Sequence, residues 1–285
     1  MLRPVIDSIA APFRKDLKMP FRIVQLTDLH IFRNPETLLK GVATWHFFEQ
    51  VLQHLKQLNP QPDAVVITGD HTHDELPETY SAVRQMLNPW IDRLWQVPGN
   101  HDDRRQLRSI FSDRVSGSGD QPIRFRFEAP GWLCLGLDTH VPGSVAGRLD
   151  EEQLAWIKTE LLASRETRCA LFMHHPPVLL NSVWMDAIGL SGRELLADLC
   201  SHENRIRLIC CGHVHHESHG QLAQAAVRTT PSTGIQFAPD SDAPRFVPGQ
   251  PGFRIIDLTP SGYSTEIRSI AETARPENIP AQTSS

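Results

Sequence analysis

Gly99-Asn100-His101-Asp102 directly follows a predicted strand at residues 93–97. The glycine permits a tight turn where a backbone comes close to a ligand. An amide, an imidazole and a carboxylate then occupy three consecutive positions. Polar groups gathered beside a buried strand cost free energy unless a site uses them. We therefore take Asn100, His101 and Asp102 as candidate functional residues.

Four further stretches repeat this pattern, in which an apolar run ends in polar side chains. They are Asp28-Leu29-His30, Gly69-Asp70, His174-His175 and Gly212-His213-Val214-His215. In the first half of the chain such runs alternate with helical patterns, which predicts a largely parallel sheet. Ligand sites of such sheets lie at the carboxyl ends of the strands. The five stretches are therefore expected to meet in one site, and their recurrence is stronger evidence than any single motif.

These stretches offer imidazoles, carboxylates and one amide oxygen, but no thiolate. This set favours iron, manganese or zinc over calcium. Seven residues are good candidate ligands, which is more than one ion needs: Asp28, His30, Asp70, Asn100, His174, His213 and His215. We therefore predict two ions joined by a bridging carboxylate. Two ions about 3.5 Å apart can clamp both ends of an in-line phosphoryl displacement.

Length and apolar periodicity predict one large α/β domain at residues 21–270. Helices are expected at residues 35–58, 77–90, 103–111 and 191–200, with another that starts at residue 150. Strands are expected at residues 21–27, 63–68, 93–97, 123–128, 132–137, 169–173, 205–211, 226–236, 252–258 and 264–269. The pair at 123–128 and 132–137 is expected to form an antiparallel hairpin. Residues 1–20 form an N-terminal extension, and residues 271–285 are expected to be a disordered tail.

Composition argues against several classes of partner. The chain has 285 residues and a formal net charge of −5, so no general basic surface attracts nucleic acid or an anionic membrane. No apolar run is long enough for a membrane span, and the N-terminus lacks the apolar core of a signal peptide. The five cysteines include no CxxC pair, which favours reduced thiols. We therefore expect a cytoplasmic protein without nucleic-acid or membrane partners.

Several residues near these motifs stay open. His71, His73 and Asp74 either support the ligands from behind or are simply polar loop residues. His140 is either a substrate-side residue or a hydrogen-bonded loop histidine. Trp184 lies in an apolar loop at residues 181–188, which is a candidate wall or lid of the site.

The motifs DxH, GD, GNHD, H-x-P and GHxH run in order from Asp28 to His215, and the chain resembles the calcineurin-like metallophosphoesterases. This resemblance implies a four-layer sandwich of two mixed β-sheets flanked by helices. It implies that one metal ion is bound by Asp28, His30, Asp70 and His215. It implies that the other is bound by Asp70, Asn100, His174 and His213, with Asp70 bridging. His174 is favoured over His175 because the family histidine lies two positions before a proline.

The same resemblance implies how the substrate is held. His101 is expected outside the metals, near the phosphate and the leaving oxygen, with Asp102 orienting it. Residues expected at the substrate are His30, Asp70, Asn100, His101 and His215.

Within the superfamily the chain is most similar to bacterial 3′,5′-cyclic-AMP phosphodiesterases of the CpdA/Icc type, also called class III. The similar segments are Thr27 to His30, Gly41-Val42 with Trp45, GRLDEEQLAW at 147–156, LICCGHVH at 208–215, and Thr230-Pro231-Ser232-Thr233 with Gln236-Phe237. The resemblance implies a cytoplasmic monomer or homodimer with iron and/or manganese, and zinc as a further candidate. Its expected reaction is hydrolysis of cyclic AMP to 5′-AMP by a hydroxide that bridges the metals.

Two alternatives accompany this expectation. One is a broader phosphodiesterase that acts on 2′,3′-cyclic nucleotides, glycerophosphodiesters or nucleotide-lipids, because fold and motifs alone do not settle the substrate. The other is a non-catalytic scaffold with this fold, which should lack some of the ligands.

Overall fold

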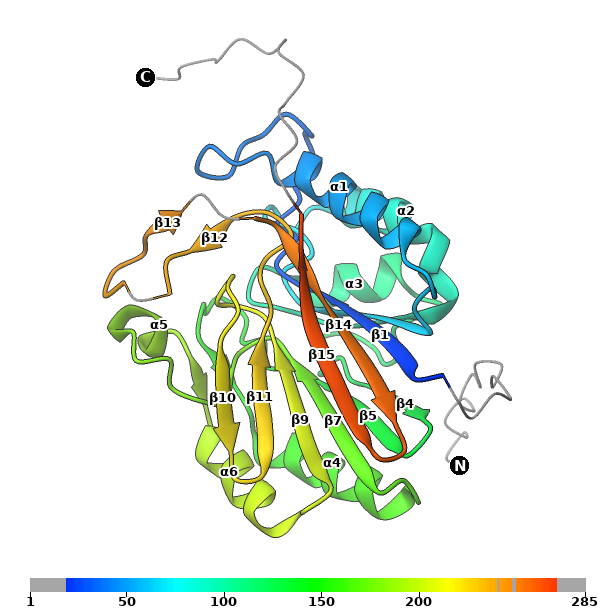
Figure 1. Ribbon diagram of the computed structural model, residues 1–285. Coiled ribbons are helices and arrows are strands. Elements are labelled where there is room, and N and C mark those ends of the chain that lie inside the picture. The colour runs from blue at the N-terminus through cyan, green and yellow to red at the C-terminus, as the bar shows by residue number, and fades with distance from the viewer. Residues whose placement is uncertain (1–18, 240, 248–249, 271–285) are drawn as a thin grey trace.

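Two β-sheets stand face to face in the computed structural model, which describes residues 19–239, 241–247 and 250–270 (Figure 1). The first sheet has the order β15-β14-β1-β2-β3. Its strands are β1 (Phe21–Leu26), β2 (Ala64–Thr68), β3 (Leu94–Val97), β14 (Gly252–Thr259) and β15 (Gly262–Ser269). Strands β1, β2 and β3 are parallel, whereas β14 and β15 run antiparallel to their neighbours. The sheet is therefore mixed.

The second sheet has the order β10-β11-β9-β7-β5-β4. Its strands are β4 (Phe125–Ala129), β5 (Trp132–Leu137), β7 (Arg168–Met173), β9 (Ile206–Cys211), β10 (His219–Leu222) and β11 (Ala225–Thr229). Its four central strands are parallel, and β4 and β10 are antiparallel edges. Two short pairs join β6 (Gly147–Arg148) to β8 (Leu190–Ser191) and β12 (Gln236–Phe237) to β13 (Phe246–Val247).

Helices cover the outer face of each sheet. Those on the first sheet are α1 (Thr44–Gln57), α2 (Pro77–Leu87) and α3 (Arg104–Ile110), with the 3₁₀ turn η1 (Asn88–Arg93). Those on the second sheet are α4 (Glu151–Ala163) and α6 (Arg193–His202), and the short α5 (Val183–Ala187) lies between β7 and β8 in the chain. Phe48 and Val65 exemplify the first apolar layer, and Ile157 and Leu171 the second. A third layer, which includes Phe172, lies between the sheets.

This arrangement confirms the expected four-layer sandwich of two mixed sheets flanked by helices. The hairpin of β4 and β5 is antiparallel, as expected. No helix within the described ranges is long and apolar enough to cross a bilayer. The expected tail at 271–285 and residues 1–18 of the expected extension lie outside the described residues.

Three local expectations were wrong. The helix expected at residues 35–58 begins only at Thr44, because Lys40 and Gly41 adopt positive φ angles and Leu39 pairs with Val42 instead. Apolar residues of this loop imitate helical spacing. The loop expected at 181–188 contains α5, and the strand expected at 226–236 ends at Thr229. Strand β10 was not expected, because its sequence HGQL carries no alternating apolar pattern.

Candidate metal centre

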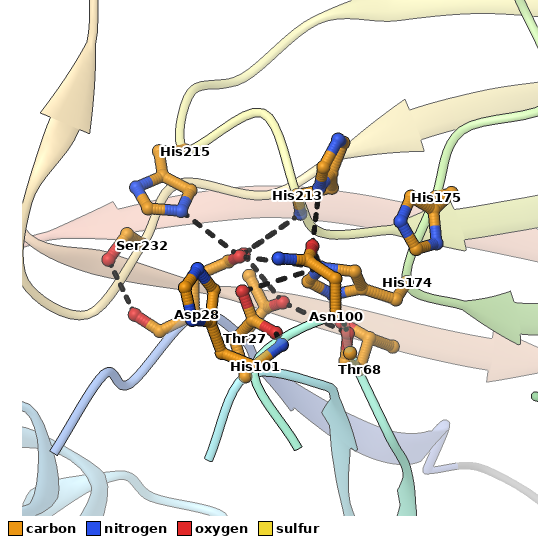
Figure 2. A network of polar contacts seen from close by, with 12 residues as sticks. Thr27, Asp28, Thr68, Asn100, His101, His174, His175, His213, His215 and Ser232 are labelled. Atoms are coloured by element: carbon orange, nitrogen blue, oxygen red, sulfur yellow. Dashed lines mark hydrogen bonds and ion pairs between the residues drawn. The ribbon is translucent and has the colours of Figure 1, made fainter. Parts of the chain in front are cut away.

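Five strands deliver the candidate ligands to one place. Asp28 and His30 follow β1, Asp70 follows β2, and Asn100 follows β3. From the second sheet, His174 follows β7, and His213 and His215 follow β9. Figure 2 shows Asp28, Asn100, His174, His213 and His215 converging on one another. The carboxyl ends of parallel strands therefore meet at one edge of the sandwich, as the alternation of strands and helices predicted.

One group of side chains corresponds to the first expected ion site. Asp28, His30, Asp70 and His215 each offer a ligand atom, and these atoms all lie within 4.8 Å of one another. His215 Nε2 lies 3.1 Å from Asp28 Oδ1, and His30 Nε2 lies 3.4 Å from Asp70 Oδ2. All four residues are buried. Two imidazoles and two carboxylates at these spacings suit a small divalent or trivalent cation.

The second group adjoins the first through Asp70. Asn100 Oδ1 lies 3.1 Å from His174 Nε2 and 3.0 Å from His213 Nδ1. His174 Nε2 also lies 3.5 Å from Asp70 Oδ2. The Asp70 carboxylate is thus near histidines of both groups, which is the position that a bridging ligand requires.

Main-chain carbonyls fix the orientation of three of these histidines. Each of the three has one ring nitrogen that faces away from the cluster and lies near a carbonyl oxygen. His174 Nδ1 lies 2.7 Å from the oxygen of Thr68, His213 Nε2 lies 3.1 Å from that of Ile188, and His215 Nδ1 lies 2.8 Å from that of Ile235. A carbonyl only accepts hydrogen bonds, so these nitrogens are the donors. In the neutral ring the other nitrogen then presents a lone pair to the cluster. Such outward hydrogen bonds are a recurring feature of histidines that bind metal ions.

Burial and charge set the protonation of the cluster. Burial raises the pKa of Asp70 to about 8, against the influence of His101, and the carboxylates of Asp28 and Asp102 raise it further. Burial and neighbouring imidazoles hold the pKa of His30 and His213 well below the usual range. Burial opposes ionisation of Asp28, but His215 nevertheless lowers the pKa of its carboxyl group. Neutral imidazoles beside buried carboxylates fit a site for cations, which would offset the cost of the buried negative charge.

The backbone beneath the cluster is strained. Five candidate ligands have positive φ angles, namely Asp28 (54°), His30 (46°), Asp70 (55°), His213 (71°) and His215 (54°). Residues other than glycine rarely adopt this left-handed region, and each costs about 1–3 kcal/mol that the surrounding structure must offset. Gly99 permits the close approach, because a Cβ there would lie 2.1 Å from Asp70 Oδ1. The same Asp70 atom accepts a 2.8 Å hydrogen bond from His101 N.

Two hydroxyl groups support Asp28. Thr27 Oγ1 donates to Asp28 Oδ2 at 2.8 Å, and Ser232 Oγ donates to the Asp28 carbonyl oxygen at 2.6 Å (Figure 2). In the sequence, Thr27 and Ser232 stood out only as parts of segments that resemble the family. Nothing in the sequence predicted that their hydroxyl groups contact Asp28.

Asp102 has partners other than the expected one. Its carboxylate accepts hydrogen bonds from Gly99 N at 2.9 Å, His71 Nδ1 at 2.9 Å and Tyr80 Oη at 3.0 Å. Within the described part of the chain, no hydrogen bond joins it to the His101 ring. The expectation that Asp102 orients His101 is therefore corrected: Asp102 holds the turn that carries His101.

The residues left open by the sequence now have places. His71 is fully buried between Asp102 and Gln96, whereas His73 contacts the rings of His30 and His101. Asp74 accepts a hydrogen bond from Arg33 N.

His175 lies beside the cluster, with its ring 4.4 Å from that of His213 and a ring nitrogen near those of His174 and His213. Its Nδ1 lies 2.8 Å from Thr139 Oγ1, and its Nε2 lies 2.9 Å from the Val145 carbonyl oxygen. Both ring nitrogens are thus engaged, and the geometry favours His174 as the ligand.

A cavity of about 350 Å³ opens beside the cluster. Asn100, His101, Arg104 and His140 line it, together with residues 142–145. The Arg104 guanidinium is held by Asp138 Oδ2 at 2.7 Å and by the His140 carbonyl oxygen. His140 therefore shares a cavity wall with His101, which suits a substrate-side residue.

Trp184 is linked to the cluster by aromatic contacts. Its ring packs edge-on against Phe237 at 5.2 Å, and Phe237 stacks on His215 at 4.3 Å. The α5 segment thus reaches the cluster through Phe237.

Comparison with known proteins agrees with this geometry. Residues 21–217 match the family model of calcineurin-like phosphoesterases. A 3′,5′-cyclic-nucleotide phosphodiesterase of Nostoc sp. is 30% identical over 89% of this chain and 94% of its own length. The 3′,5′-cyclic adenosine monophosphate phosphodiesterase CpdA of Pseudomonas aeruginosa is 30% identical, over 84% of this chain and 86% of its own length. A protein of Arcobacter nitrofigilis named "Probable glycerophosphodiester phosphodiesterase GpdQ" is 30% identical over 76% and 80%.

The fold has a solved counterpart as well. The crystal structure of a dimetal phosphatase from Danio rerio superposes with a TM-score of 0.67, over 88% of this chain and 97% of that one. At 16% identity this likeness concerns the fold alone. The family model covers well over half of the chain, and the motifs that it spans carry the metal cluster. The chain therefore belongs to the calcineurin-like phosphoesterase family.

Proposed function

We propose that the protein hydrolyses 3′,5′-cyclic AMP to 5′-AMP with two bound metal ions. The observation that carries the proposal is the Asp70 carboxylate, which lies between two groups of imidazoles. Relatives named as cyclic-nucleotide phosphodiesterases match this chain over most of their length, which supports the choice of substrate. Hydrolysis of this substrate would lower cellular cyclic AMP.

The proposed ligand sets follow the two groups of side chains. Asp28, His30, Asp70 and His215 would hold one ion, and Asp70, Asn100, His174 and His213 the other. The donor set favours iron and manganese, with zinc as a further candidate. When bound, such ions withdraw charge from phosphate oxygens and lower the pKa of water, which supplies hydroxide as the nucleophile.

The side chains around the ions then bind and orient the diester. We propose that His30, Asp70, Asn100, His101 and His215 surround the phosphate. His101, at the edge of the cavity, would donate a hydrogen bond and then a proton to the departing 3′ oxygen. The cavity of about 350 Å³ is large enough to receive a nucleoside. Asp102 contributes by fixing the turn that carries His101.

The setting of the enzyme is part of the proposal. We propose that residues 21–270 form the catalytic domain and that the protein acts in the cytoplasm as a monomer or homodimer. The five cysteines are buried and unpaired, which supports a reducing compartment.

A broader phosphodiesterase is the second candidate. The relative from Arcobacter nitrofigilis, named for glycerophosphodiesters, favours it. The scaffold alternative requires missing ligands, but all seven are present and gathered in one place.

A substrate panel tests the proposal. Protein of measured metal content is assayed with 3′,5′-cyclic AMP, cyclic GMP, 2′,3′-cyclic AMP, glycerophosphocholine and bis-p-nitrophenyl phosphate. A marked preference in kcat/KM for 3′,5′-cyclic AMP is the expected result. Good turnover of bis-p-nitrophenyl phosphate with little of cyclic AMP would reject the named substrate and keep the phosphodiesterase.

A further inference from the structure

His101 needs something to hold its ring in position. Its backbone is fixed, because His101 N donates to Asp70 Oδ1 at 2.8 Å. Among the described residues, however, its ring nitrogens have no hydrogen-bond partner, and Asp102 is occupied elsewhere. The ring instead contacts two other imidazoles. It lies edge-on to His30 at 5.1 Å, and it stacks on His73 at 4.6 Å with an interplanar angle of 23°.

His73 is itself fixed from several sides. Phe32 packs against its ring at 4.8 Å. His73 N donates to the Ile31 carbonyl oxygen at 2.9 Å, so the loop that carries His73 is joined to the one after β1. Its Nδ1 lies 3.2 Å from His30 Nδ1. His73 therefore presents a flat, anchored face to the His101 ring.

We propose that His73 is a positioning residue that orients His101 through this stacked face. The inference rests on the proposed function in one respect, namely that His101 faces the leaving oxygen. A planar surface on one side restricts rotation of the His101 ring, so that its N–H keeps its direction toward the substrate. The contact between His73 Nδ1 and His30 Nδ1 adds a second link. His73 there occupies the position that carbonyl oxygens take at the outward nitrogens of His174, His213 and His215.

Two variants of similar size distinguish the effect of stacking on His101 from the other effects of replacing His73. His73→Phe and His73→Leu both fill the space, and both remove the nitrogen that meets His30. Only His73→Phe keeps a flat ring against His101. Any effect on metal binding through His30 is therefore shared by the two variants, and His46→Ala on α1 serves as a control outside the site.

The readout is the dependence of kcat on the leaving group. Methyl p-nitrophenyl phosphate releases p-nitrophenolate, a stable anion. Methyl phenyl phosphate releases the more basic phenolate and therefore depends more on hydrogen-bond donation. With both ions bound, His73→Leu should lose about 10–100-fold on the more basic leaving group, the scale of a small misplacement, and little on the other. His73→Phe and His46→Ala should keep the wild-type ratio.

A second readout does not depend on activity. In ion-free protein labelled with ¹⁵N-histidine, the ring signals of His101 should broaden or split in His73→Leu. In His73→Phe they should stay single.

Equal losses on both leaving groups in His73→Leu, or the same ratio in His73→Leu and His73→Phe, would overturn the inference. Failure of the proposed substrate is distinguishable, because the wild-type protein would then leave cyclic AMP intact while the aryl diesters still report on His73.

Discussion

The rear and the front of the metal centre are held by different contacts. The rear histidines, His174, His213 and His215, are buried and donate hydrogen bonds to main-chain carbonyls. The front pair, His73 and His101, is partly exposed and held by ring stacking. Stacking restricts a ring without engaging its nitrogens, whereas each rear ring has one nitrogen engaged by a carbonyl oxygen. In the proposed function the rear would therefore hold the ions, and the front would leave the ring nitrogens of His101 free to meet the substrate.

Backbone conformation follows this division only in part. Left-handed residues occur at Asp28, His30, Asp70, His213 and His215, but not at the rear histidine His174 or at the front pair His73 and His101. Backbone strain of this kind persists only where the surrounding contacts are strong enough to hold the residue in its conformation. The substitutions below set the rear against the front, beginning with the largest expected effect.

Asp70→Asn should have the largest effect, because it removes the charge shared by both ion sites. We expect loss of both ions and a fall in kcat/KM of at least about 10³-fold, since the ions supply several kcal/mol of transition-state stabilisation. Metal analysis per chain and steady-state kinetics measure the two effects. Asp113→Asn, which alters an exposed carboxylate paired with Arg84, is the matched control. Two ions retained in Asp70→Asn would rule out the bridge.

His101→Ala should separate the front from the rear. We expect both ions to stay bound while kcat falls by about 10²–10⁴-fold, the usual contribution of a general acid. Metal content and kcat are compared with those of His46→Ala, which should match the wild type. Unchanged turnover in His101→Ala would remove its proposed role.

The pH dependence of ion binding should follow Asp70. Its pKa is raised to about 8, so the ion-free protein keeps a proton there at neutral pH, and a bound ion must displace it. Affinity should therefore rise about tenfold per pH unit up to about pH 8 and level off above it. His30 and His213, whose pKa values are lowered, are already neutral in this range and should release no protons. Titrations with Zn²⁺ or Mn²⁺ would disagree with this if affinity stayed constant between about pH 6 and 8.

Asp102→Asn should have the smallest effect on turnover and a clear effect on stability. The variant disturbs a buried hydrogen-bond network with His71, Tyr80 and Gly99, and leaving a buried polar group unsatisfied costs about 1–3 kcal/mol. Urea unfolding measures the loss of stability, and the leaving-group ratio measures the orientation of His101. If Asp102→Asn changed the leaving-group ratio as strongly as His73→Leu does, the result would show that Asp102 orients His101.

Local sequence patterns predicted an α/β domain with parallel strands and the side chains that gather at their ends, whereas the two-sheet sandwich was implied by the family resemblance. Alternation of strands and helices makes neighbouring strands parallel, so that polar residues after β1, β2 and β3 had to share an edge. The starts of α3 and α4 were also predictable, because Asp103 Oδ1 and Asp150 Oδ1 accept the N-terminal hydrogen bonds of these two helices.

Contacts between distant segments were not predictable in this way. The resemblance implied that Asp102 orients His101, but the partner of Asp102 is His71, from a loop 31 positions earlier. His73 was left open for the same reason, since stacking on His101 depends on how two loops meet in space. The left-handed backbone at Asp28 and Asp70 was not predicted either, because aspartate is enriched in this region but adopts it only in a small share of cases.

The most direct test of the central claim is a single turnover of 3′,5′-cyclic AMP in H₂¹⁸O. Wild-type protein and Asp70→Asn are compared, each with and without added metal ions. The account predicts 5′-AMP with one ¹⁸O atom in its phosphate, formed by the wild type only when ions are bound. Hydrolysis that persists without ions or in Asp70→Asn, or intact cyclic AMP with the ion-loaded wild type, would contradict it.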